Sequence, residues 1–315
     1  MPTKIILDCD PGHDDAVAML LAWGSPEIEL LAVTTVGGNQ TIEKVTRNAL
    51  SVARIAGIAG IPFARGAAHP LLRPVEVAAE IHGDSGLDGP VLPEPTLELD
   101  PRHGAQLIVD TVMAAEPGEI TLVPTGPLTN IALAVRLEPR IVERVREVVL
   151  MGGGAHVGNW SAVAEFNIVV DPEAAAVVFE AGWPVTMVGL DLTHQALATD
   201  EVVASIRAIG TGPARFADEL MDFFASSYKE AVGFEHPPVH DPCAVAYVID
   251  PTIVRAVPAP IVVETRGEHT LGMTVVDLRG PAPEGTRTKV ALELDHARFW
   301  ALVVDAIRNL GDPEL

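Results

Sequence analysis

The chain has 315 residues, of which 48% are hydrophobic and 20% are charged, the composition of a folded globular protein rather than a disordered one. Its 43 acidic and 21 basic residues give a formal net charge of −22, so it lacks the basic surface that neutralises nucleic-acid phosphates or anionic lipid. These numbers argue against a nucleic acid and against a membrane as partners.

Cysteine usage and the length of the apolar runs bear on the compartment. Cys9 and Cys243 are too few for a disulfide framework, and we expect no signal peptide because residues 1–4 lead directly into an apolar segment. No apolar run reaches the roughly 18 residues of a membrane-spanning helix. We therefore expect a soluble, cytoplasmic protein.

Short apolar segments alternate with longer helical ones through the first part of the chain. The expected strands are Ile5–Asp10, Leu30–Val36, Ile61–Ala64, Ile120–Pro124, Val148–Met151 and Val185–Val188. The expected helices are Asp14–Trp23, Thr41–Ala56, Gly104–Ala115, Leu128–Leu137 and Glu173–Ala181. Strands that are apolar throughout are typical of a parallel sheet covered on both faces. The alternation predicts an α/β fold with an open, mostly parallel, doubly wound sheet.

The pattern changes in the last third of the chain. Helices are expected at about Glu201–Ile209, Pro213–Gly233 and Ala297–Leu310. Four short strands suggest a small antiparallel addition near the C-terminus: Ile253–Ala256, Ile261–Glu264, Met273–Asp277 and Val290–Leu294. We find no linker, low-complexity tract or internal repeat, and we expect the proline-rich stretch 90–101 to be a loop. We therefore predict a single domain over residues 1–315.

Four aspartates crowd the junction between the first strand and the first helix: Asp8, Asp10, Asp14 and Asp15. Asp8 and Asp10 are expected on the same side of the strand, and the Pro11–Gly12 turn brings the other two back toward them. Like charges this close disfavour ionisation unless a cation lies among them, and carboxylates suit a hard ion such as Ca²⁺ or Mg²⁺. Helix capping explains Asp14 or Asp15 alone, but it does not explain the pair on the strand.

Other polar segments follow the expected strands, and ligands bind at the carboxyl ends of the strands in open α/β sheets. These segments are Thr35–Asn39, Pro124–Pro127, Met151–Gly154 and Leu190–Asp191. The glycines at 152–154 do not form a phosphate loop, because neither GxxxxGK[ST] nor a helix-opening GxGxxG is present. The clustering predicts a ligand site at that edge of the sheet.

His240 and Asp241 have two interpretations each. Asp241 precedes Pro242, and this pair is a common helix start, so Asp241 is either a cap or a ligand. His240 is either a plain polar residue or a group suited to proton transfer, because histidine titrates near neutral pH.

Two further segments are equally open. Asn159, Glu165 and Asn167 offer donors and acceptors for sugar hydroxyls, or they belong to a polar surface loop over residues 158–167. The segment His82–Leu87 lies in a long connection rich in Gly and Pro, and it is either a lid over a site or a loose surface loop.

Taken together, these motifs resemble the nucleoside hydrolase family, also called inosine-uridine preferring nucleoside hydrolases. The motifs that carry the resemblance are Asp8–Asp15, Val36–Asn39, His82–Gly83 with Gly86–Leu87, Thr125–Asn130, Met151–Gly153, Glu165–Asn167 with Asp171–Ala174, and His240–Pro242. They run in the family's order from the first strand to about residue 250. Asp88 is a departure, because the family more often has glycine at that position.

The resemblance implies calcium-dependent hydrolysis of the N-glycosidic bond of inosine-, uridine- and cytidine-type ribonucleosides to ribose and free base. By position, the implied metal ligands are Asp10, Asp15, the backbone carbonyl of Thr125, and Asp241. The implied ribose-binding residues are Asp14, Asn39, Met151, Asn159, Glu165 and Asn167. The implied catalytic residues are Asp10, which takes a proton from the metal-bound water, His240 beside the leaving base, and His82 as a base-site histidine.

The residue chemistry agrees with these implied roles. Cleavage of an N-glycosidic bond passes through an oxocarbenium-like transition state, which negative charge around the sugar stabilises. A divalent ion lowers the pKa of its water, and a nearby histidine can protonate the departing base.

Two aromatic residues are further candidates for substrate binding. Tyr228 lies on an expected helix before His240, where it stacks on the base, shares in its protonation, or simply packs. Phe166 is a similar case, with core packing as the favoured alternative. His82 and His240 together favour a non-specific or pyrimidine-leaning base preference. The resemblance also suggests a homodimer or a homotetramer.

Two other functions stay open at this stage. An aspartate-dependent phosphohydrolase would also have Asp8 and Asp10 at the end of a first strand, but it needs a cationic side chain for phosphate, and the four lysines are poorly placed for that role. A catalytically idle protein that binds Ca²⁺ and a nucleoside is the second, and His240 and the full set of candidate metal contacts argue against it.

Overall fold

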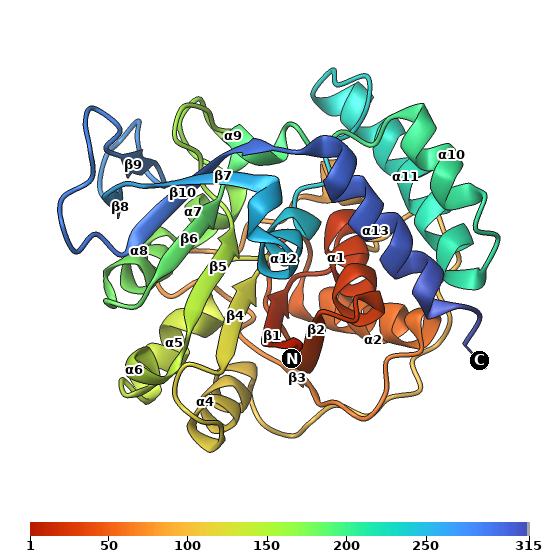
Figure 1. The fold of residues 1–315 in the computed structure, drawn as a ribbon, viewed down its shortest axis with the longest axis horizontal. Helices are drawn as coiled ribbons and strands as arrows, with labels where there is room; N and C mark the ends of the chain where they lie inside the picture. The colour runs from red at the N-terminus through yellow and green to blue at the C-terminus, as the bar shows by residue number, and fades with distance from the viewer. Residues whose placement is uncertain (314–315) are drawn as a thin grey trace.

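The centre of the fold is an eight-stranded sheet, seen in a computed structural model that describes residues 1–313 (Figure 1). Its strand order is β3-β2-β1-β4-β5-β6-β10-β7, and each neighbouring pair is parallel except β10 with β7. The strands are β1 (Thr3–Cys9), β2 (Ile28–Thr35), β3 (Phe63–Arg65), β4 (Ile120–Pro124), β5 (Glu147–Met151), β6 (Val185–Val188), β7 (Val254–Pro258) and β10 (Thr288–Leu294). A separate antiparallel pair consists of β8 (Ile261–Val263) and β9 (Thr274–Val276). The predicted fold class is confirmed.

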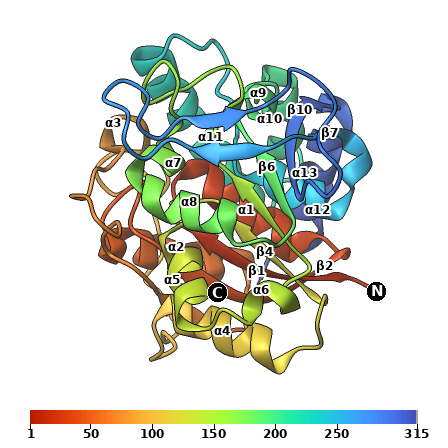
Figure 2. The same cartoon turned by 90° about the vertical axis from the view of Figure 1, so that its left-hand side faces the viewer.

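Helices cover both faces of the sheet (Figures 1 and 2). One face carries α1 (His13–Gly24), α2 (Ile42–Ala56), α12 (Pro242–Ile249) and α13 (His296–Leu310), with α10 (Asp200–Arg207) and α11 (Gly212–Ala231) packed outside them. The other face carries α4 (Gly104–Ala114), α5 (Thr129–Leu137) and α8 (Pro172–Glu180). Two clusters of buried apolar side chains fill these layers, and β1 supplies both, with Ile5 and Leu7 in one and Ile6 in the other. This alternation explains why the strand is apolar throughout.

Several short helices are not predicted by the sequence pattern, because one or two turns do not establish an apolar period. They are α3 (Ala79–His82), α6 (Ile141–Arg144), α7 (Phe166–Val170), α9 (Leu190–Thr193) and the 3₁₀ helix η1 (Pro251–Ile253). The longer α12 also lacks a clear apolar stripe, because residues 242–247 are all buried. Within residues 1–313, no helix combines the length and the apolar character needed to cross a bilayer.

The position of β10 differs from the sequence-based prediction. The sequence pattern predicts this segment as part of a hairpin addition, but β10 lies in the main sheet, parallel to β6, and β7 pairs with it antiparallel at the edge. About a hundred residues separate β6 from β10 in the chain, so the local pattern carries no information about which strand it joins.

The carboxyl ends of the central strands meet at one edge of the sheet. Asp10 follows β1, Asn39 lies beyond β2, Thr125 follows β4, and Met151 ends β5. The parallel arrangement of these strands therefore brings the polar segments together, as ligand sites in such sheets require.

Candidate active site

A cavity of about 600 Å³ opens at this edge of the sheet. Most of the site residues predicted from the sequence line it: Asp14, Asn39, His82, Thr125, Met151, Asn159, Glu165, Phe166, Asn167, Tyr228, His240 and Asp241. Asp10 and Asp15 are fully buried directly behind this lining, where Asp10 accepts hydrogen bonds from Asn39 and Asp15 accepts one from Thr125. The fold thus gathers the predicted residues from distant parts of the chain.

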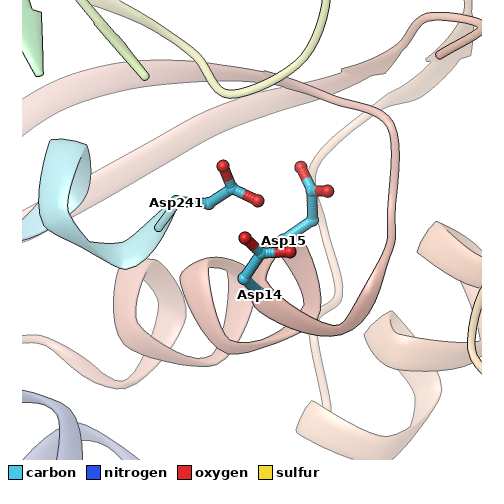
Figure 3. Close-up of side chains that lie close together, drawn as sticks. All are labelled: Asp14, Asp15 and Asp241. Carbon is cyan, nitrogen blue, oxygen red and sulfur yellow. The ribbon is translucent and has the colours of Figure 1, made fainter. Parts of the chain in front are cut away.

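Three carboxylates lie close together (Figure 3), two of them in the lining of this cavity and that of Asp15 behind it. Asp14 and Asp15 come from the first turn of α1, and Asp241 precedes α12. One carboxylate oxygen from each lies within 4.8 Å of the others, and all three side chains are buried. Such a cluster is suited to holding a metal ion.

No cationic side chain balances the negative charge that these carboxylates carry when ionised, among the residues that the structure describes. Burial, with the neighbouring carboxylates, raises the pKa of Asp14 to about 7 and holds the pKa values of Asp10 and Asp241 well above their usual range. Within residues 1–313, no Lys or Arg forms an ion pair with these aspartates. A divalent cation would supply the missing positive charge.

Asp10 provides a second sign that a cation fits here. Its Oδ2 accepts the main-chain N–H of Asn39 at 2.6 Å, whereas its buried Oδ1 has no hydrogen-bond partner among the described residues. The carboxylate fits because Gly38 and Gly126 have no Cβ, which would overlap it in either case. A buried carboxylate oxygen without a partner is costly unless a positive group reaches it.

Thr125 and Asn167 tie the strand ends to the loop above them. The Thr125 hydroxyl donates to Asp15 Oδ1 at 2.8 Å, and its carbonyl oxygen accepts from Asn167 Nδ2 at 2.7 Å. A carbonyl oxygen has two lone pairs, so this bond leaves one available for a cation.

The polar segment 158–167, expected as a loop, is a loop only as far as Glu165, the N-cap of α7. The Glu165 carboxylate accepts main-chain N–H groups from Gly153 at 2.8 Å and Asn167 at 2.9 Å, and burial raises its pKa to about 7. Asn159 accepts from the main-chain N–H of Phe166 at 2.9 Å. These bonds fix the direction of the segment at the wall of the cavity.

His240 has a protein partner on each ring nitrogen. Nδ1 lies 2.8 Å from the Thr193 hydroxyl, and Nε2 lies 2.8 Å from the Tyr228 hydroxyl. Burial lowers the pKa of His240 to about 3, so the ring is neutral. Thr193, at the end of α9, and His194, which lines the cavity, are not anticipated from the sequence, because no motif marks them.

The structure also adds neighbours that the sequence reasoning missed. His13 contacts His82, and Trp160, Val232 and Phe234 join the lining as an apolar rim. His13 lies within the aspartate motif, but the sequence pattern there points to the carboxylates and not to His13. Exposed Trp160 and Val232 lie on irregular segments that carry no periodic signal.

Asp8 does not belong to the carboxylate cluster. Its Oδ1 accepts from the Thr34 hydroxyl at 2.6 Å and from Asn130 Nδ2 at 2.7 Å, and burial raises its pKa to about 7. The interpretation of all four aspartates as one group is therefore wrong for Asp8, because two neutral donors already hold it away from the cavity.

Comparisons with known proteins agree with this geometry. The family model for inosine-uridine preferring nucleoside hydrolases matches residues 5–301. The chain is 58% identical over 315 residues to the inosine-uridine preferring nucleoside hydrolase of Crithidia fasciculata, covering the whole of both. It is 46% identical to the pyrimidine-specific ribonucleoside hydrolase RihA of Photobacterium profundum, over 98% of this chain and all of that one.

A solved structure is also closely similar. The purine-preferring ribonucleoside hydrolase from Gardnerella vaginalis superimposes with a TM-score of 0.92 at 35% identity, covering 98% of this chain and 99% of that one. The family predicted from the sequence is confirmed by these matches. Because the family model spans almost the whole chain and a full-length relative is more than half identical, the chain belongs to the inosine-uridine preferring nucleoside hydrolase family.

Proposed function

We propose that this protein hydrolyses the N-glycosidic bond of ribonucleosides, releasing ribose and a free base. The observation that carries the proposal is the buried cluster of Asp14, Asp15 and Asp241 beside a cavity of about 600 Å³, a size typical of small-molecule sites. The name of the Crithidia relative favours inosine and uridine as substrates.

Calcium is the cation that we expect at this cluster. Asp10, Asp15, Asp241 and the Thr125 carbonyl would hold it, because these are the oxygen ligands that Ca²⁺ prefers. The partnerless Oδ1 of Asp10 and the lack of ion pairs to the cluster support this assignment. When bound, the ion would supply positive charge that lowers the pKa of a coordinated water.

Asp10 is the general base in this proposal. Asn39 holds its Oδ2, which leaves Oδ1 to accept the proton of the attacking water. Asp14, Asn39, Asn159, Glu165 and Asn167 would surround the ribose, with Met151 against it, as their positions in the lining support. Their carboxylates would stabilise the oxocarbenium-like transition state by negative charge.

The leaving base would receive its proton from the pair of His240 and Tyr228. Both ring nitrogens of His240 already contact hydroxyls and the ring is neutral, so the Tyr228 hydroxyl, which lines the cavity, would give its proton to the base while His240 Nε2 orients it. The proton that Asp10 takes from the attacking water balances this transfer, and Tyr228 recovers its proton when the products leave. His82 and Phe166 would lie on the side of the base. This role for Tyr228 extends the expectation that it shares in protonation.

A panel of nucleosides tests the proposal. Inosine, uridine, cytidine and adenosine, each with its 2′-deoxy form, are incubated with the protein and Ca²⁺, and free ribose and free base are measured. We expect release from the ribonucleosides and a large loss on removing the 2′-hydroxyl. Saturable binding of inosine in calorimetry without release of hypoxanthine would favour the idle binding protein instead.

The phosphohydrolase alternative has little support. No Lys or Arg is among the described residues that line the cavity, so a phosphate would meet carboxylates alone. Assays with p-nitrophenyl phosphate and p-nitrophenyl riboside separate the two activities, and we expect hydrolysis of the riboside alone. The cytoplasmic location, the single domain and the homodimer or homotetramer stay predictions.

A further inference from the structure

His13, the first residue of α1, connects the aspartate motif to the segment that carries His82. Its Nε2 donates to the main-chain carbonyl of Asp88 at 2.9 Å, since a carbonyl can only accept. Its main-chain N–H donates to His82 Nδ1 at 3.3 Å, and the Nδ1 atoms of the two rings are 3.2 Å apart. His13 is fully buried and does not line the cavity.

The His13 ring is held on its faces as well as at its edges. It lies nearly parallel to the rings of Phe223 and Phe224 on α11, with centroid distances of 5.1 and 5.2 Å. The His82 ring stacks on it at 5.4 Å with an interplanar angle of 23°. Because both faces and edges have partners, the ring has one orientation available.

The Asp88 end of this connection is itself rigid. The Asp88 carboxylate accepts the main-chain N–H groups of Asp84 at 3.0 Å and Ser85 at 3.1 Å, closing a turn just after His82. The Asp88 carbonyl is therefore a fixed acceptor for His13. This gives a structural reason for an aspartate at a position where the family resemblance leads us to expect glycine.

These contacts determine which edge of His82 faces the cavity. His82 Nδ1 lies 3.3 Å from the main-chain nitrogen of His13 and 3.2 Å from His13 Nδ1, so this edge of the ring is turned to α1. Within residues 1–313, no protein group forms a hydrogen bond with His82 Nε2, and Nε2 is not fully buried, whereas His82 lines the cavity. The edge turned to the cavity is thus the Nε2 edge.

We propose that His13, anchored at the Asp88 carbonyl, is a positioning residue that holds His82 in one ring orientation, with its Nδ1 edge toward α1 and its Nε2 edge toward the base of the substrate. The role of His82 at the base rests on the proposed function, whereas its orientation does not.

Replacements of His13 by two amides test the anchor. In His13→Gln the amide can reach the Nε2 position and still donate to the Asp88 carbonyl, whereas the shorter side chain of His13→Asn cannot. Both lose the aromatic stacking equally, so they form a matched pair. We expect kcat with uridine to fall by about 10–100-fold in His13→Asn, as for other residues that orient a functional histidine, with KM little changed. His13→Gln should retain most of the activity.

Nitrogen NMR of the histidine rings gives a readout that is independent of turnover. In the calcium-loaded wild type, the His82 signals, assigned by their loss in His82→Gln, should show a single tautomer, with one protonated and one bare ring nitrogen. In His13→Asn they should move toward a mixture of the two tautomers. Phe223→Leu, which removes a stacking partner but keeps the hydrogen bonds, should leave them unchanged.

The outcomes separate this proposal from the proposed function. A wild-type His82 that already shows a mixture of tautomers, or a His13→Asn variant with unaltered His82 signals, overturns the positioning role whatever the activity. Equal kcat in the Gln and Asn variants overturns the Asp88 anchor. If His82→Gln hydrolyses uridine at the wild-type rate while the spectra behave as expected, the orientation holds, and the base-site role in the proposed function fails.

Discussion

Asp8 and Asp10 are two residues apart at the end of β1, yet their surroundings give them different chemistry. Asp8 Oδ1 accepts from the Thr34 hydroxyl and the Asn130 amide, which are neutral donors. Among the described residues, Asp8 Oδ2 and Asp10 Oδ1 both lack a hydrogen-bond partner, but only Asp10 lies beside the carboxylate cluster, where its main-chain N–H donates to Asp15. We infer that Asp8 has a structural role and that Asp10 is available for proton transfer.

Replacing each aspartate by asparagine tests this difference. Asp10→Asn keeps the size of the side chain but removes its ability to accept a proton, so we expect kcat with inosine to fall by about 10²–10⁴-fold. Asp8→Asn is the matched control and should retain activity, because an amide oxygen still accepts from Thr34 and Asn130. Wild-type turnover by Asp10→Asn in the presence of Ca²⁺ would refute the assignment.

The contact between Tyr228 and His240 predicts a dependence on the leaving group. Tyr228→Phe and His240→Ala should each slow inosine and uridine by about 10²-fold or more, because their bases leave as poor anions without a proton. Hydrolysis of p-nitrophenyl riboside should change little, because nitrophenolate needs no proton to leave. Tyr247→Phe is the control, since Tyr247 is the other tyrosine of the chain and is buried in α12. Equal losses on both kinds of substrate would contradict the prediction.

Two aspartate–proline pairs show that the role of a single residue cannot always be predicted from the local sequence. Asp171 caps α8 by accepting the main-chain N–H of Ala174 at 3.1 Å. Asp241 also stands before a proline and a helix, but it makes no capping bond and faces α1 instead (Figure 3). The local patterns are the same, so the difference depends on what the fold brings nearby, which the sequence does not state.

Some residues that cap helices also join separate secondary-structure elements. The second oxygen of Asp171 accepts from the hydroxyl of Thr129, in the first turn of α5, at 2.7 Å and from the main-chain N–H of Leu71 at 2.8 Å. One carboxylate therefore connects α8, α5 and the connection that leads to α3. These hydrogen bonds bear on the site, because the connection that contains Leu71 leads to α3, which ends at His82.

Removing this cap should cost more than removing an ordinary one. Asp171→Ala loses the helix cap, worth about 1 kcal/mol, and also leaves the partners at Thr129 and Leu71 unsatisfied, at about 1–3 kcal/mol. Asp295→Ala is the control, because the Asp295 side chain caps α13 at the surface and, among residues 1–313, accepts a hydrogen bond only from Arg298 in its own helix. In urea denaturation, the free energy of unfolding should fall clearly more for Asp171→Ala than for Asp295→Ala. Equal losses would mean that the bonds to Thr129 and Leu71 contribute nothing to stability.

The long elements are predictable from the sequence and the short ones are not. The strand β1 and the helix α2 have unmistakable apolar patterns, with α2 ending at Gly57 in the left-handed conformation (φ 67°). By contrast, α3, α7 and α9 have four or five residues each. They are held by caps and neighbours rather than by periodicity, and they carry His82, Asn167 and Thr193 of the site.

For the protein as a whole, the carboxylate cluster links stability to protons and to the cation. In the folded protein without metal, burial raises the pKa of Asp14 to about 7, from an ordinary value of 3.8, and holds the pKa values of the proposed ligands Asp10 and Asp241 well above their usual range. Folding thus favours the protonated forms, so this contribution is fully present below about pH 4 and is lost as the pH rises through about 7. A cation displaces the protons of its ligands, and its stabilising effect should grow over the same range.

Melting curves with and without Ca²⁺ check this linkage. At about pH 5.5 chelation should change Tm little, whereas at about pH 8 it should lower Tm markedly. The expected stabilisation is about 2.7 kcal/mol when free Ca²⁺ is about 100 times its Kd. Asp241→Asn should remove most of the difference at the higher pH. A calcium effect that is the same at both pH values would contradict the raised pKa values.

More than two hundred residues of chain separate Asp15 from Asp241, and this has a consequence for biosynthesis. A ribosome that has released α1 through α11 has produced a nascent polypeptide with most of its sheet but without one wall of the ion cage. Loading with the ion must therefore wait until α12 has left the exit tunnel and docked on α1. Loading would then be a late step in the synthesis of this protein, sensitive to how much free divalent ion the surrounding fluid holds at that moment.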